Sequence, residues 1–203
     1  MDGFITCLCS QEMDLYVLKQ VLSQAHGKSQ VQGSSTACIV RLVRDDAAPE
    51  ESGRYRCQGI NLGDSGFIIV RNGEVAFKSS PQQHGFNFPF QLGFDDVHDL
   101  PESADEYAVP VNTGDVIVVG TDGLFDNVFD EEIAKFVSEN QNMGNGPEAL
   151  AKELAITAQN MGIDFQRRSP FSVAAEEAGF EYRGGKLDDV TVIVSFVDEG
   201  ELE

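Results

Sequence analysis

Two hydrophobic periods alternate along the first part of the chain and predict its elements. Residues 10–27 carry apolar side chains at helical spacing, between Ser10, which suits a helix cap, and Gly27, which suits a helix end. The period then changes to that of strands in "GSSTACIVRLV", "RYRCQGINLG" and "SGFIIVRNGEVAFKS". The pair Asn72-Gly73 inside the last run is a strong signal for a type I′ hairpin turn. A helix followed by three or four antiparallel strands is therefore predicted.

The rest of the chain passes from irregular sequence to helices and ends on a strand. Residues 79–115 contain four prolines and no sustained period, which predicts a long loop or flap. Helices are predicted at 131–140, 147–161 and 170–178, between a valine-rich strand at 116–120 and a buried strand in the closing "DVTVIVSFV". A block of strands, then helices, then a returning strand indicates an α+β fold in which helices cover antiparallel sheets.

The composition is that of an acidic protein with one globular domain. The 203 residues are 41% hydrophobic, and 14 Lys and Arg against 34 Asp and Glu leave a formal net charge of −20. Such a charge repels nucleic acid and anionic membranes. No apolar run approaches the roughly 18 residues that span a bilayer, and the first residues do not resemble a leader. We expect a monomer with no nucleic-acid partner, no membrane span and no visible targeting segment.

The cysteines indicate reduced thiols. Cys7, Cys9, Cys38 and Cys57 do not make the disulfide framework of a small secreted protein, and they lack the spacing of a zinc finger. Buried, reduced side chains are the expectation.

Acidic residues gather where predicted strands meet turns. Asp64 lies in "NLGDSG", Asp122 and Asp126 lie in "TDGLFD", and Asp188 and Asp189 lie in "GGKLDD". Each of these sequences contains glycine, which lets a backbone or a ligand come close, and strand ends hold side chains in fixed positions. If the turn after "TDG" is helical, the two acids of that motif are four residues apart and share one face.

Carboxylates held close together need a cation. Without one they raise one another's pKa and cost stability, whereas a hard divalent ion such as Mg²⁺ or Mn²⁺ turns the group into a binding site. Two such ions can activate a water molecule and neutralise a phosphoryl group in line with it. This is how an acidic protein can act on phosphate.

Each acid also has a purely structural explanation. Asp-Gly is a common turn pair, Asp188 and Asp189 can begin a strand, and Asp64 can cap a turn. Asp130 suits the N-cap of the following helix. The run "DDVHDLPESADE" lacks the spacing of a calcium-binding loop, which predicts a solvated acidic flap.

Neither histidine of this flap is assigned any chemistry. His84 and His98 have no partner at the spacing of a nucleophile and base motif. The hydroxyls of "SSTAC" lack the Gly-x-Ser-x-Gly elbow of a serine nucleophile, so this segment is expected to be the start of a strand.

In order along the chain, five segments resemble the metal-dependent serine/threonine protein phosphatases, the PPM or type 2C-like family. The segments are "GSSTACIV", "NLGDSGFIIVRNGEV", "QQHGFNFPFQL", "GTDGLFDN" and "RGGKLDDVTVIV". The third of them, together with "SPFSVAAEEAGFEYRGGKLDD", is similar to the small mitochondrial-matrix branch of that family. The resemblance implies two packed antiparallel sheets with helices outside each, in α-β-β-α layers.

The resemblance also implies a site and a reaction. Asp122 and Asp188 match ligands of a core pair of Mg²⁺ or Mn²⁺ ions, and Asp126 and Asp64 match the acids that hold a weaker third ion. Gly123, of the "TDG" motif, and Asp189 match supporting positions. The implied reaction is attack of a metal-bridging water on phosphoserine or phosphothreonine, with no covalent enzyme intermediate and a phosphoprotein as substrate.

The first residues depart from the family pattern. The family has its first strands, a phosphate-binding Arg and an Ala-Asp-Gly-Val-Gly-Gly segment upstream of the "GSSTA" strand, and only 32 residues precede Gly33 here. Asp2-Gly3 is followed by "FITC" rather than a glycine pair. We therefore expect residues 1–32 to be a helical remnant and residues 33–203 the C-terminal portion of a phosphatase domain whose N-terminal strands are missing. Such shortening is expected to impair catalysis.

Three functions remain open at this stage. The first is hydrolysis of phosphoserine and phosphothreonine in proteins. The second is a catalytically silent binding module with the same fold, and the third is a phosphatase of a small phosphorylated metabolite. The resemblance implies a mitochondrial-matrix location; otherwise the cytoplasm is expected.

Overall fold

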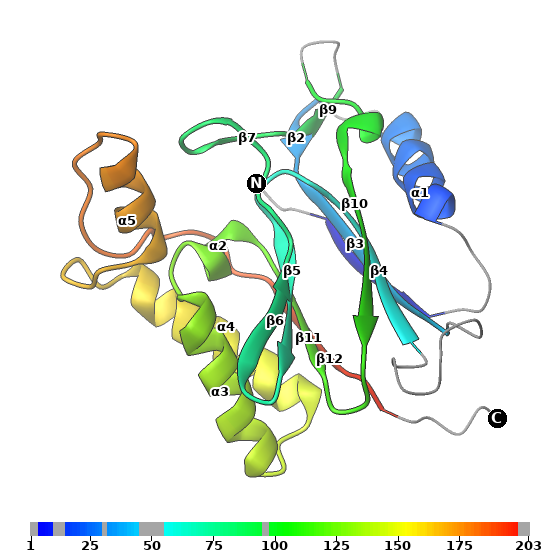
Figure 1. The fold of residues 1–203 in the computed structure, drawn as a ribbon. Coiled ribbons are helices and arrows are strands. Elements are labelled where there is room, and N and C mark those ends of the chain that lie inside the picture. Colours follow the sequence, from blue (N-terminus) through cyan, green and yellow to red (C-terminus); the bar gives the residue numbers. More distant parts are fainter. Residues whose placement is uncertain (1–3, 10–14, 30–31, 45–54, 95–97, 199–203) are drawn as a thin grey trace. The chain divides into compact units, whose positions relative to one another are not determined.

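The computed structural model describes residues 4–9, 15–29, 32–44, 55–94 and 98–198 (Figure 1). These residues belong to two compact units. One comprises Met1–Gly66, Ser79–Gly114 and Val197–Glu203, and the other comprises Phe67–Lys78 and Asp115–Phe196.

The first unit is built on a four-stranded sheet. Its strands lie in the order β1 (Phe4–Cys9), β3 (Ala37–Arg44), β4 (Tyr55–Leu62) and β10 (Asp105–Val111). Strand β1 is parallel to β3, whereas the β3–β4 and β4–β10 pairs are antiparallel. Helix α1 (Leu15–Lys28) packs its apolar face against this sheet, where Leu18 and Leu22 join the core of the unit.

The same unit carries short elements between its long strands. Strand β2 (Ser34–Ser35) pairs with β9 (Leu92–Gly93), and β7 (Gln83–Gly85) pairs with β8 (Phe88–Pro89). A 3₁₀ turn, η2 (Pro101–Ser103), precedes β10.

The second unit carries a second four-stranded sheet, in the order β12 (Val192–Phe196), β11 (Val116–Gly120), β5 (Gly66–Arg71) and β6 (Glu74–Lys78). The β5–β6 hairpin turns through Asn72 and Gly73, which both have positive φ as a type I′ turn requires. Four helices follow β11. They are α2 (Asp122–Phe125), α3 (Asp130–Asn142), α4 (Pro147–Gly162) and α5 (Pro170–Glu177).

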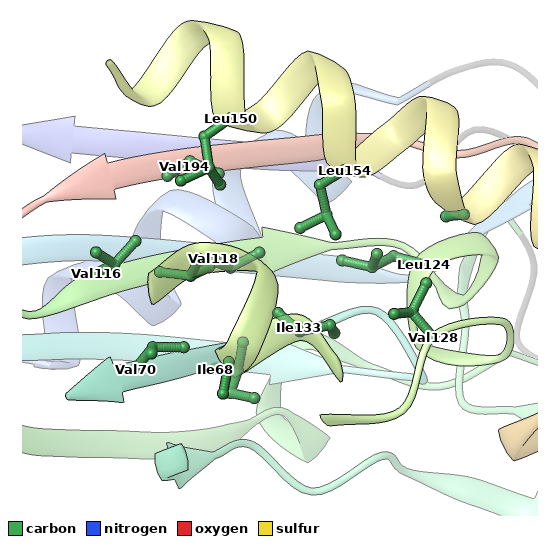
Figure 2. Close-up of a cluster of buried hydrophobic side chains, with 13 residues drawn as sticks. Ile68, Val70, Val116, Val118, Leu124, Val128, Ile133, Leu150, Leu154 and Val194 are labelled. Carbon is green, nitrogen blue, oxygen red and sulfur yellow. The ribbon is translucent and has the colours of Figure 1, made fainter. Parts of the chain in front are cut away.

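The core of this unit lies between the sheet and helices α3 and α4 (Figure 2). Val116 and Val118 alternate along β11, so both side chains point to the same face of the sheet. Leu150 and Leu154 of α4 are one helical turn apart and pack on that face. Val118 and Leu124, which flank Asp122 in the sequence, are buried in this core, and this anchors the end of β11.

Most of the predicted elements are confirmed, with small shifts at their ends. Strand β11 and helices α3, α4 and α5 lie where the periodicity placed them. Helix α1 is described from Leu15, so the expected Ser10 cap lies outside the described residues, and Gly27 lies inside the helix rather than ending it. Strand β1 was not predicted, so the first 32 residues are not only helical. The division at residue 33 stays a prediction.

Two local predictions were wrong. The N-cap position of α3 is held by Phe129, while Asp130 is the first helical residue and forms an ion pair with Lys78 at 2.7 Å. The cap function falls to Glu132, whose carboxylate accepts the Phe129 N–H at 3.1 Å. The predicted loop at 79–115 contains β10. Pro110 hid this strand, and the sheet tolerates Pro110 because β10 is an edge strand.

The α+β class is confirmed, with helices and with sheets that are antiparallel except at the parallel β1–β3 pair. Cys38 and Cys57 are fully buried and are not disulfide-bonded, as expected, whereas the side chains of Cys7 and Cys9 lie outside the described set. Among the helices that the structure describes, none combines the length and the apolar character needed to cross a bilayer.

Candidate metal centre

The site begins where the apolar strand β11 ends at Gly120. Thr121 stands at the N-cap and the single-turn helix α2 begins at Asp122. The Asp126 N–H donates to the Asp122 carbonyl at 2.7 Å, which is the hydrogen bond of one helical turn. The two acids of "TDGLFD" therefore lie on one face, as their spacing predicted.

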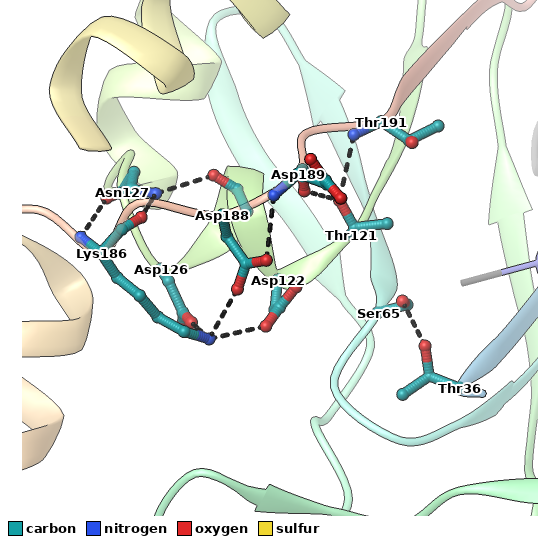
Figure 3. A network of polar contacts seen from close by, with 11 residues as sticks. Thr36, Ser65, Thr121, Asp122, Asp126, Asn127, Lys186, Asp188, Asp189 and Thr191 are labelled. Atoms are coloured by element: carbon teal, nitrogen blue, oxygen red, sulfur yellow. Dashed lines mark hydrogen bonds and ion pairs between the residues drawn. The ribbon is translucent and has the colours of Figure 1, made fainter. Parts of the chain in front are cut away.

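A distant segment, residues 184–191, is held against α2 by two polar side chains. The buried amide of Asn127 donates to the Lys186 carbonyl at 2.8 Å and accepts the Lys186 N–H at 2.9 Å. Thr121 Oγ1 donates to the Asp189 carbonyl at 3.3 Å and accepts the Thr191 N–H at 3.1 Å. Figure 3 shows both pairs of hydrogen bonds, one pair on each side of Asp188.

Gly123 allows this close approach. A Cβ at this position would lie 2.3 Å from the carbonyl oxygen of Asp189, which is closer than any side chain tolerates. The glycine of the "TDG" motif is thus required by the backbone that crosses it. This contact gives Gly123 and Asp189 a structural role beside the acids; their functional role stays a prediction.

Three carboxylates meet around one ammonium group at this point (Figure 3). Lys186 Nζ lies 2.7 Å from Asp122 Oδ2, 2.8 Å from Asp126 Oδ2 and 3.2 Å from Asp188 Oδ2. The Lys186 side chain is 16% exposed, and the three carboxylates are between 25% and 33% exposed. Asp122 and Asp188, which are far apart in the sequence, therefore converge on a shared cation.

The electrostatics of the group are those of a partly desolvated acidic cluster. Burial raises the pKa of the Asp126 carboxyl to about 6, even though the Lys186 ammonium acts to lower it. Burial alone lowers the pKa of Lys186, but the charges and hydrogen bonds of Asp126 and Asp122 outweigh it, so the pKa of Lys186 is raised. One ammonium cannot balance three carboxylates, so the cluster retains an attraction for positive charge.

No group of three or more His, Cys, Asp or Glu side chains in the described part of the chain already surrounds a metal position. The carboxylates of the cluster are turned toward Lys186 Nζ instead. The Lys186 ammonium is the cation with which these carboxylates pair.

The carboxylates of the other predicted residues are not among the three that contact Lys186. Asp189 is exposed and donates its N–H to Asp188 Oδ1 at 2.9 Å. Asp64 follows β4 in the other compact unit, so its part in the site stays a prediction. Asp2 lies outside the described residues.

His84 gains a partner that its sequence position did not reveal. Its Nε2 lies 3.0 Å from Asp99, and its ring stacks on Phe90 with centroids 4.0 Å apart. The side chain is exposed, and the Asp99 carboxylate also accepts the Gln91 N–H at 2.9 Å.

Sequence reasoning missed two residues of the site, Lys186 and Asn127. No local signal marked Lys186, which looks like a solvated lysine in the sequence. Asn127 follows the "TDGLFD" motif directly and lies in the turn after helix α2. Neither role is visible until the distant segments are brought together.

The relatives found by comparison with known proteins are named as protein phosphatases. The chain is 45% identical to "Probable protein phosphatase 2C 80" of Arabidopsis thaliana over 177 residues, which cover 87% of this chain and 40% of the relative. It is 41% identical to the protein phosphatase PTC7 homolog of Homo sapiens over 175 residues, 82% of this chain and 55% of that relative. No family model matches the chain.

A solved structure extends this likeness to three dimensions. The X-ray structure of the photosystem II phosphatase PBCP matches with a TM-score of 0.76 and 33% identity, over 88% of this chain and 70% of that chain. The fold is therefore that of a type 2C protein phosphatase, and the chain belongs to this PPM family. Within the family it is similar to the PTC7 homologs of Danio rerio and Homo sapiens. The chain spans 40% and 36% of the length of two of its plant relatives.

Proposed function

We propose that the protein hydrolyses phosphoserine and phosphothreonine in protein substrates, with Asp122 and Asp188 as ligands of a pair of divalent metal ions. The observation that carries this proposal is the convergence of three carboxylates from two distant segments on one cationic group. The names of the relatives, which are protein phosphatases, support the reaction class.

The donor set suits a hard divalent ion. Carboxylate oxygens are the ligands that Mg²⁺ and Mn²⁺ take in proteins, and partial burial makes their charges costly without a cation. When bound, such ions supply an activated water and neutralise charge on the phosphoryl group. Asp126 and Asp64 remain the proposed ligands of a weaker third ion.

The residues of the chain have separate tasks in this proposal. Asp122 and Asp188 bind, while Asn127 and Thr121 keep the two segments in register. Gly123 leaves room for the Asp189 carbonyl. The Lys186 ammonium competes with a divalent ion for the same carboxylate oxygens, so metal binding requires Nζ to move away from them.

The test is release of phosphate from a phosphothreonine peptide by the 203-residue chain with and without Mn²⁺. We expect Mn²⁺-dependent turnover that falls on the order of 100-fold in Asp122→Asn, because charge stabilisation at the phosphoryl group is lost. Asp198→Asn, an exposed acid outside the cluster, is the matched control. Turnover that needs no metal, or that survives Asp122→Asn, contradicts the mechanism.

A catalytically silent binding module is the second candidate, and one observation favours it. Lys186 already neutralises part of the acidic cluster without any ion. This function is tested by calorimetry together with the phosphatase assay. Weak Mn²⁺ binding without release of phosphate supports the binding module.

For location we propose the mitochondrial matrix, on the similarity to the PTC7 homologs. PBCP, the relative of solved structure, is a photosystem II phosphatase. Imaging of a fluorescent fusion of the whole gene product in its own cells tests the assignment, and a signal outside mitochondria contradicts it.

A further inference from the structure

A cavity of about 580 Å³ lies beside helix α5. Its walls come from residues 165–168 before the helix, residues 180–184 after it, and Ser172 and Glu176 on the helix itself. All of them belong to the compact unit that holds the carboxylate cluster. None of the candidate metal ligands lines the cavity, so it is a separate site.

The two walls are tied together by backbone contacts. Gly185 N donates to the Asp164 carbonyl at 2.8 Å, and Ser169 Oγ donates to the Gly184 carbonyl at 2.7 Å. Gly184 has a φ of +90°, and a Cβ there would lie 2.6 Å from Phe165 Cα. The cavity is therefore formed in the chain itself, and a ligand does not have to bear the cost of ordering its walls.

Three arginines line the cavity, out of 14 basic residues in a chain of net charge −20. Arg167 forms an ion pair with Glu132, yet its buried Nε has no hydrogen-bond partner in the described structure. Arg168 and Arg183 are exposed, and within the described residues neither forms an ion pair or hydrogen bond. The guanidinium donors of Arg168 and Arg183 are thus available at the cavity.

Exposed aromatic rings accompany these arginines. Phe165 is 82% exposed and Phe180 is 58% exposed, and both line the cavity with Tyr182. Aromatic residues and arginine together are typical of surfaces that bind polypeptides. Two acids, Glu176 and Glu181, also line the cavity and limit where a negatively charged group can sit.

We propose that this cavity binds an acidic segment of the phosphoprotein substrate. Carboxylate or phosphate groups of that segment are held by the exposed Arg168 and Arg183, because guanidinium groups pair with such anions in two-point geometry. On a strongly acidic protein this basic site selects substrates whose sequence beside the phosphorylated residue is itself acidic. The inference rests on the proposed phosphatase function, since it names the class of substrate.

One aromatic ring connects the cavity to the carboxylate cluster. Tyr182, on the cavity side, meets the Phe171 ring edge-on with centroids 4.7 Å apart. Lys186 Nζ lies 5.1 Å from the centroid of the same ring. The cavity and the carboxylate cluster are therefore linked through Tyr182, Phe171 and Lys186.

The experiment measures binding by fluorescence anisotropy in EDTA, so that it does not depend on catalysis. The probes are a labelled peptide with a phosphoserine followed by a run of glutamates, and the matched peptide with glutamines. We expect the acidic peptide to bind the 203-residue chain at least ~10-fold more tightly. Arg168→Ala and Arg183→Ala should each remove most of that preference, and Arg183→Lys should restore part of it.

Matched variants make the test decisive. Lys152→Ala removes a positive charge from the exposed face of α4 and should leave the preference unchanged, whereas Glu181→Gln should strengthen binding of the acidic peptide. Equal affinity for the two peptides, or equal loss in Lys152→Ala and Arg183→Ala, overturns the proposal. The binding assay measures no turnover, so its result does not depend on whether the chain hydrolyses phosphate. Conversely, a cavity that does not bind the acidic peptide does not change the outcome of the phosphatase assay.

Discussion

Lys186 sets the ionic state of the site, because its Nζ is the cation that three carboxylates share. Lys186→Met keeps the aliphatic stem and removes the charge. We expect the metal-free protein to lose about 1–3 kcal/mol of stability, between the values of exposed and fully buried ion pairs. The increase in melting temperature caused by Mn²⁺ should become larger, because a competitor for the carboxylates is gone. Thermal denaturation in EDTA and in Mn²⁺ measures both effects.

The control for that prediction is Lys135→Met, which removes an exposed ammonium 3.8 Å from Glu139. This pair should contribute little, as exposed pairs on a helix do. If Lys186→Met and Lys135→Met behave alike in both solutions, then Lys186 does not compete with metal ions.

For the substitution Gly123→Ala, helix propensity and packing predict opposite effects on stability. In a helix, Ala is favoured over Gly by roughly 1 kcal/mol. Here the new Cβ would lie 2.3 Å from the Asp189 carbonyl oxygen, so Gly123→Ala must push the 184–191 segment away from α2. We expect a net loss of about 1–3 kcal/mol, as for overpacked cores. Chemical denaturation measures it.

Gly27→Ala provides the matched control, since Gly27 lies in helix α1 with nothing within 4 Å of the added Cβ. That variant should gain stability by up to about 1 kcal/mol. A gain of similar size in Gly123→Ala means that the backbone contact with Asp189 is not a constraint on the site.

At the scale of elements, the site is the junction of helix α2 with the segment before β12, and Asn127 is the main polar link. Its side chain satisfies both backbone groups of Lys186 and also donates to the Gly123 carbonyl at 2.9 Å. Asn127→Ala leaves buried backbone groups unpaired, with an expected loss of about 2–4 kcal/mol. Asn160→Ala, at an exposed position on α4, is the control, and hydrogen exchange at the Lys186 amide reports the local opening. Unchanged protection of that amide contradicts this role.

The sequence predicted the elements whose hydrophobic pattern is local. Strand β11 and helices α3 to α5 have strong periods and clear end signals such as Pro147 and Pro170. Strand β10 was missed because its pairing with β4 is a long-range contact, and Pro110 within it is tolerated only at a sheet edge. Local strand propensity reports neither the long-range pairing nor the edge position of β10.

The same distinction between local and long-range signals applies to the site. The shared face of Asp122 and Asp126 follows from their spacing of four residues in a helical turn. The approach of Asp188 depends on tertiary contacts made by Asn127 and Thr121, and it was expected only from the family resemblance. The position of Lys186 inside the cluster was not expected, because nothing local distinguishes it from a solvated lysine.

At the scale of the whole molecule, a net charge of −20 makes any cation stabilising to some degree. Salt screens the repulsion among exposed carboxylates without needing a site, so this effect rises smoothly with ionic strength. A specific centre behaves differently, because stabilisation by a bound ion follows its concentration relative to the dissociation constant. The two kinds of stabilisation can be separated by comparing Mn²⁺ with Na⁺ at matched ionic strength.

We expect Mn²⁺ to raise the melting temperature beyond the effect of NaCl, with a midpoint that reports the affinity of the cluster. At a concentration about 100 times the dissociation constant, the gain is about 2.7 kcal/mol. In Asp122→Asn combined with Asp188→Asn, the response to Mn²⁺ should fall to that of NaCl, because only screening remains. Asp198→Asn should keep the full response, since that acid lies outside the cluster. Equal responses to Mn²⁺ and Na⁺ in the unmodified chain mean that the three carboxylates act only as part of a diffuse negative surface.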